Sequence, residues 1–117
     1  MKKVFVFYLF LSLISCNTIT DQNPEGVYVC KYEHEFAKTE DTLLLKRINK
    51  NYFTIIRHLG VTSKANSKKQ IISEVWKLDY DNNKNVFTEM KTGKVLIWNA
   101  DKQILIFGNR EYVRSNY

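Results

Sequence analysis

Few residues in this chain could do acid–base, nucleophilic or metal chemistry, and their spacing does not bring them together. The chain has two histidines, His34 and His58, and two cysteines, Cys16 and Cys30. The His-Glu pair at 34–35 begins like the zinc-binding helix motif, but that motif needs a second histidine at position 38, where Lys38 stands. In an extended chain, residues 33–35 alternate between opposite faces and cannot chelate one ion together. We therefore predict no metal site.

Catalytic motifs of other kinds are also missing from the sequence. It contains no glycine-rich phosphate loop and no G-x-S-x-G turn. The adjacent acids Glu40 and Asp41 precede an apolar run and fit the start of a strand better than an acid–base pair. We expect no catalytic residue, no cofactor and no enzymatic activity.

The N-terminus carries the pattern of an export signal. Lys2 and Lys3 precede an apolar run over residues 4–14, which is too short to span a bilayer as a helix. The run ends in Leu-Ile-Ser-Cys at 13–16, which resembles the bacterial lipobox. That resemblance implies cleavage before Cys16, a diacylglycerol thioether on its thiol and, as a rule, an acyl chain such as palmitate on its amino group.

This signal predicts where the mature protein resides. Asn17 stands where an aspartate would favour retention at the inner membrane, so we expect the outer membrane, with the domain facing the periplasm. We predict a signal peptide over 1–15, a lipidated flexible tether over 16–25 and one domain over 26–117. The membrane is then a partner through lipid on Cys16, and export argues against nucleic acid despite the net charge of +6.

The rest of the chain predicts an all-β domain. Hydrophobic residues make up 44% and aromatic residues 14%, with one proline, and short apolar runs alternate with turn signals about every ten residues. This pattern is typical of a small antiparallel meander of about eight strands that forms a barrel or curled sheet. We expect strands at 27–32, 42–48, 52–59, 71–80, 86–90, 95–98, 104–107 and 111–114, with 61–70 as a mobile hairpin tip.

The last hairpins can be paired from their turn residues. Turns at 92–93, 100–101 and 108–109 predict that Phe87 faces Trp98 and that Leu105 faces Tyr112, with Ile97 opposite Ile104. One face of this sheet is then aliphatic: Val86, Met90, Val95, Ile97, Ile104, Ile106 and Val113. The other is largely aromatic, with basic residues at its ends: Phe87, Leu96, Trp98, Leu105, Phe107, Tyr112, Lys94, Arg110 and Arg114.

Two apolar faces leave alternatives open, because an antiparallel sheet with one wet face shows one polar side. The aromatic face could fill a closed barrel, line a ligand cavity with Lys94 and Arg110 at its rim, or meet a partner. Lys64, Lys68 and Lys69 form a basic loop that is either a solvated tip or a contact for lipid headgroups. Cys30 has no disulfide partner if Cys16 is lipidated, and we expect it to be a small buried residue.

Several segments of the mature chain resemble small uncharacterised lipoproteins of Bacteroidota-type bacteria. They are 26–29 (GVYV), 36–44 (FAKTEDTLL), 52–55 (YFTI), 76–80 (WKLDY), 91–94 (KTGK) and 108–112 (GNREY). These are strand starts and turns, so the resemblance transfers no catalytic residue. The Gly-x-Tyr at 26–28 is similar to the Gly-x-Trp that opens lipocalin-like barrels, and residues 28–30 resemble the first strand of membrane-bound lysozyme inhibitors, which use a disulfide that this chain lacks.

We therefore expect a membrane-anchored envelope lipoprotein whose domain is a non-catalytic binding or structural module. The first alternative is a carrier of a small apolar or amphiphilic ligand. The second is an inhibitor of an exported hydrolase such as lysozyme.

Overall fold

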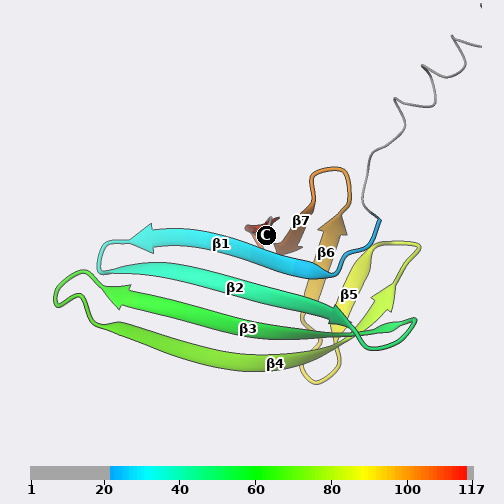
Figure 1. Ribbon diagram of the computed structural model, residues 1–117, viewed down its shortest axis with the longest axis horizontal. Coiled ribbons are helices and arrows are strands. Elements are labelled where there is room, and N and C mark those ends of the chain that lie inside the picture. Colours follow the sequence, from blue (N-terminus) through cyan, green and yellow to red (C-terminus); the bar gives the residue numbers. More distant parts are fainter. Residues whose placement is uncertain (1–21, 116–117) are drawn as a thin grey trace, which may run out of the picture.

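The computed structural model describes residues 22–115, and these form eight antiparallel strands that close into one barrel (Figure 1). The strands follow the chain in order: β1 (Gly26–His34), β2 (Ala37–Arg47), β3 (Tyr52–Ser63), β4 (Lys69–Asp81), β5 (Val86–Glu89), β6 (Val95–Asn99), β7 (Ile104–Phe107) and β8 (Arg110–Arg114). Each strand pairs with the next, and β8 pairs with β1. The predicted all-β meander of eight strands is thus confirmed. The predicted signal peptide and Cys16 lie outside the described residues.

The two halves of the barrel differ in strand length. β1 to β4 have 9, 11, 12 and 13 residues, whereas β5 to β8 have four or five. β8 meets β1 at only two residue pairs, Tyr28 with Arg114 and Val29 with Val113. β5 meets β4 only from Leu78 onward. The barrel therefore closes at one end, and at the other end β1 to β4 continue as a curved four-stranded sheet (Figure 1).

We call this continuation the open sheet. It comprises residues 30–34, 37–40, 59–63 and 69–75. Its two hairpin turns lie at 35–36 and 64–68, so β2 begins five residues earlier than the sequence predicted, and the turn within the predicted tip at 61–70 is shorter than expected. Apart from Thr39, every residue of the open sheet is exposed or half-buried, so polar and charged residues populate these strand ends and the period-two apolar signal is hidden.

The closed end has a filled interior. Alternate residues of every strand point inward and form one cluster in which each side chain is at most 4% exposed: Tyr28, Leu43, Leu45, Phe53, Ile55, Trp76, Leu78, Phe87, Leu96, Trp98, Leu105 and Tyr112. Phe53 packs edge-on against Phe87 with ring centroids 5.0 Å apart, and Tyr80 stacks on Phe87 at 4.4 Å. A barrel of eight strands is just wide enough to be filled in this way.

Two of the predicted hairpin registers are wrong by two residues. Phe87 pairs with Leu96 instead of Trp98, and Ile97 pairs with Ile106 instead of Ile104. The turn after β5 is longer than predicted because the Glu89 carboxylate accepts the backbone N–H groups of Lys91 and Thr92. The turn after β6 is likewise longer, spanning residues 100–103.

The third register, Leu105 with Tyr112 across the turn at 108–109, is as predicted. A slip of two residues leaves every side chain on its original face, whereas a slip of one would reverse them. The assignment of residues to the two faces therefore survives both errors.

The end of the predicted tether is held by the barrel. Pro24 is fully buried, and its carbonyl oxygen accepts a hydrogen bond of 2.5 Å from the Tyr28 hydroxyl. The Glu25 carboxylate accepts the backbone N–H of Arg47 at 3.1 Å, and the Glu25 carbonyl accepts from the Arg114 guanidinium. Residues 24 and 25 are thus part of the folded domain, and the predicted flexible segment of 16–25 is shortened at that end.

Candidate functional site: a charged cluster where the barrel opens

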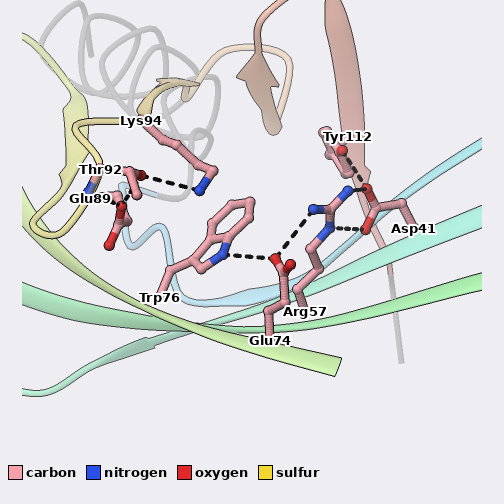
Figure 2. A network of polar contacts seen from close by, with 8 residues as sticks. All are labelled: Asp41, Arg57, Glu74, Trp76, Glu89, Thr92, Lys94 and Tyr112. Carbon is pink, nitrogen blue, oxygen red and sulfur yellow. Dashed lines mark hydrogen bonds and ion pairs between the residues drawn. The ribbon is translucent and has the colours of Figure 1, made fainter. Parts of the chain in front are cut away.

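A polar layer marks the level at which the closed barrel gives way to the open sheet. We call it the mouth cluster, and it comprises Asp41 on β2, Arg57 on β3, Glu74 on β4 and Tyr112 on β8 (Figure 2). On three strands the inward-facing row changes from apolar to charged within one step of two residues. Asp41 precedes Leu43 and Arg57 follows Ile55, both of which lie in the core. The period-two alternation of the strands therefore aims these charges at one another.

Asp41 is the centre of the mouth cluster. Its carboxylate is fully buried and accepts two hydrogen bonds from Arg57, Nε to Oδ1 at 2.9 Å and Nη2 to Oδ2 at 2.7 Å. The Tyr112 hydroxyl donates a third, at 2.7 Å to Oδ2. Arg57 also donates from Nη1 to Glu74 at 3.4 Å, and the Trp76 indole N–H donates to the same Glu74 oxygen at 3.0 Å. The chain of contacts therefore crosses four strands.

The contacts of the cluster raise the pKa values of two of its members, Arg57 and Tyr112. The hydrogen bond to Asp41 raises the pKa of Arg57, and burial followed by the bond to Asp41 raises the pKa of Tyr112. Arg57 therefore stays charged and Tyr112 stays protonated at neutral pH. Asp41 accepts hydrogen bonds from both, so it ties β2 to β3 and β8.

Two of the predicted rim cations lie on aromatic rings at this level. The Lys94 ammonium is 5.1 Å from the centre of the Trp76 ring and donates to the Thr92 hydroxyl at 3.1 Å (Figure 2). The Arg110 guanidinium is 4.1 Å from the centre of the Tyr32 ring. Both arrangements are cation–π contacts, which place the two charges against ring faces instead of leaving them free for a ligand headgroup.

The predicted ligand or partner face points into the barrel and is packed. Phe87, Leu96, Leu105 and Tyr112 are fully buried and Trp98 is 2% exposed, while Phe107 is half-buried beside Trp76. These side chains form the core, which is the filled-barrel alternative. The Trp98 indole N–H is buried and has no hydrogen-bond partner.

The histidines and Cys30 do not assemble a reactive site. The His58 ring Nδ1 lies 3.0 Å from the Ser73 hydroxyl on the exposed face of the sheet, and His34 stacks on Tyr32 with centroids 5.8 Å apart. Cys30 is half-buried and free, and burial raises the pKa of its thiol, which disfavours the nucleophilic thiolate. Within residues 22–115, no group of three potential metal ligands comes together.

The predicted basic loop is partly neutralised. The Lys64 ammonium lies 3.4 Å from the Glu33 carboxylate of the neighbouring hairpin, and the Lys69 side chain lies over Gly60. Lys68 and Lys69 line a cavity of about 340 Å³ together with Phe36. Another, of about 540 Å³, lies among lysines and glutamates that include Lys31 and Glu40, so neither sign of charge dominates it. No helix in the described part of the chain is both long and apolar enough to cross a bilayer.

Sequence reasoning missed the mouth cluster, because Asp41 was interpreted as the polar start of a strand. The signal was its position: Thr39, Asp41, Leu43 and Leu45 alternate along one strand and all point inward. The comparisons add nothing to this assignment, since no family model, curated protein or solved structure matches the chain. The resemblance to small envelope lipoproteins stays a prediction.

Proposed function

We propose that this chain is a bacterial envelope lipoprotein, anchored to the outer membrane through lipid on Cys16, whose domain is a non-catalytic binding or structural module facing the periplasm. The observation that carries the proposal is the contrast between a filled barrel and an open sheet. The inward side chains at the closed end are at most 4% exposed, which supports a filled interior, whereas the open sheet exposes Ile71, Ile72 and Val75. Binding therefore falls to the outer surface.

The anchor is tested by labelling cells with a palmitate analogue and by mass spectrometry of the mature N-terminus. The wild-type chain should carry label and a diacylglycerol mass at Cys16, and Cys16→Ser should remain uncleaved and unlabelled. Cys30→Ser is the matched control, because it removes the second thiol and should keep the lipid. A mature N-terminus at another residue without an acyl mass would refute the anchor.

The carrier alternative is tested by Trp fluorescence during titration with fatty acids and lysolipids, alongside thermal melts. Because Trp76 and Trp98 are both buried in the core, a ligand that entered the barrel would change their emission and raise the melting temperature. We expect neither change. A saturable shift of the Trp emission together with a higher melting temperature would refute the binding or structural module and support the carrier alternative.

A further inference from the structure

The open sheet has two free edges, and they differ in character. On one side β1 has no partner beyond Val29, and on the other β4 pairs only with β3 over residues 69–75. Figure 1 shows β4 as the outermost strand of the long sheet along this stretch. All seven residues of β4 over 69–75 are exposed. The β4 edge is therefore long and accessible.

Two hydrogen bonds show which backbone groups point away from β3. The Tyr80 N–H donates to Asn51 on the β3 side at 2.8 Å, whereas the Lys77 carbonyl accepts from Met90 on the opposite side at 2.9 Å. The β3–β4 register runs without interruption from Tyr52 to Thr62, so this alternation holds along the whole strand. The N–H and C=O groups of Lys69, Ile71, Ser73 and Val75 therefore face the free edge.

The β1 edge is protected in the way that natural sheets protect their edges. Its unpaired part spans only residues 30–34, carries the charged side chains Lys31 and Glu33, and is covered at Tyr32 by Arg110. The β4 edge carries its charges, Lys69 and Glu74, toward the two ends of the free stretch, and no cation–π contact covers its centre among the described residues. Ile71 and Val75 are each 64% exposed on one face, and Ile72 is 44% exposed on the other. An apolar edge of this length in a folded protein indicates a strand partner.

We propose that the partner is β4 of a second copy of this chain, paired antiparallel about a two-fold axis at Ile72. The four residues that face the edge are centred on Ile72, so the two-fold pairs Lys69 with Val75 of the second copy and Ile71 with its Ser73. Every edge-facing group then finds a partner, and about eight backbone hydrogen bonds form between the two copies. In any other antiparallel register of this strand with its copy, at least one of these four residues would lie opposite a residue outside the set.

The side chains are compatible with this register. On the inner face, Ile72 meets its own copy, and the Gln70 amide lies opposite the Glu74 carboxylate of the second copy, to which it can donate. No two like charges stand opposite each other, which would destabilise a strand pair. One register along, with the axis at Ser73, Lys69 would instead face Lys77 of the second copy.

The free edge of β4 is also long enough for the strand of the second copy. In this register the turn at 64–68 of the second copy reaches the level of Lys77, where β5 begins to cover β4. The second strand therefore occupies the gap between the hairpin tip and β5. The pairing would join two open sheets of four strands into one sheet of eight.

Disulfide trapping of the full chain in bacterial membranes tests the register. The axis places residue 72 opposite itself in a non-hydrogen-bonded pair, a geometry that brings the two Cβ atoms within disulfide range. Under mild oxidation Ile72→Cys should give a band at twice the monomer mass, at least tenfold above Val75→Cys. Val75→Cys is the matched control, since its two copies would lie about 20 Å apart on the same edge.

A second variant separates pairing from chance collision. Ile71→Pro removes one edge-facing N–H and leaves the β3–β4 ladder intact, so it should abolish trapping of Ile72→Cys without changing the thermal melt. Equal trapping at positions 72 and 75, preferential trapping of Ser73→Cys, or no trapping at 72 would each overturn the proposal. The inference goes beyond the proposed function. Trapping of Ile72→Cys in a background that also carries Cys16→Ser and Cys30→Ser needs neither lipid nor a native thiol, so failure of the anchor and failure of the pairing are distinguishable.

Discussion

Replacing Asp41 by asparagine tests whether the mouth cluster holds the barrel together. The substitution preserves the shape of the side chain and removes its charge. Arg57, whose side chain is 14% exposed, then loses the carboxylate that accepts two of its hydrogen bonds. The variant therefore leaves a largely buried guanidinium without its main counter-charge. Such an uncompensated buried charge is what makes the removal of one partner of a buried ion pair strongly destabilising.

The magnitude follows from the contacts. Removing one partner of a buried ion pair costs about 3–5 kcal/mol. Glu74 keeps one contact with Arg57 at 3.4 Å, and the asparagine oxygen can still accept from Tyr112, so we expect the low end, about 3 kcal/mol. For a domain of this size, that corresponds to a melting temperature lower by about 12–24 °C.

Urea denaturation of four proteins measures the effect: wild type, Asp41→Asn, Arg57→Met and the double variant. Because either single change strands the other charge, the double variant should lose about 2 kcal/mol less than the sum of the two single losses. Glu40→Gln is the control, since Glu40 is the exposed neighbour on the opposite face of β2 and should change stability by less than about 0.5 kcal/mol. A loss below about 1 kcal/mol for Asp41→Asn, or strictly additive losses, would refute the assigned role.

Other predictions concern the core and the turns. The pKa of Tyr112 is raised in the fold, so the unfolded chain releases this proton first, and the free energy of unfolding should fall as pH rises above about 10. In urea titrations Tyr112→Phe should reduce that fall. Part of the fall should remain, because burial also raises the pKa of Tyr80. Trp98→Ala should cost about 3–5 kcal/mol in thermal melts. Trp98→Phe should cost under about 2 kcal/mol, because it also removes an unpaired N–H, and equal losses would contradict this. Gly108 has φ 64°, so Gly108→Ala should cost about 1 kcal/mol of stability and Gly108→Asn less. Gly60→Ala in β3 should be nearly neutral, because the one close contact of the added Cβ would be the flexible Lys69 side chain, and the Glu40 carbonyl lies at an ordinary contact distance.

The fold could be predicted from sequence where alternation and turns agree. β7 and β8 have the predicted register because Gly108, at positive φ, defines a short turn between two strongly apolar strands. The two other hairpins were misaligned because side chains extend their turns. The Glu89 carboxylate caps the first, and in the second Asn99 accepts the backbone N–H of Lys102 at 3.1 Å.

The mouth cluster could not be predicted in the same way, because its members come from distant parts of the chain. Tyr112 and Asp41 lie 71 residues apart and meet only because the barrel closes. Strand length was equally hidden. The added residues of β2 and β4 are mostly polar, so they show no period-two apolar pattern. The free β4 edge became visible only once the pairing of every strand was known.

The narrow contact between β8 and β1 has a consequence for the order of folding. Every other strand pairing joins neighbours in the chain, so hairpins can form one after another with short loops to close. The β1–β8 contact joins the two ends of the domain through two residue pairs, with the Ser115 N–H donating to the Val27 carbonyl beside them. Because it closes the longest loop of the barrel, its formation costs more chain entropy than that of any hairpin. Closure should therefore be the last step of folding and the first to reverse, and native-state hydrogen exchange should release the amides of β8 before those of β3.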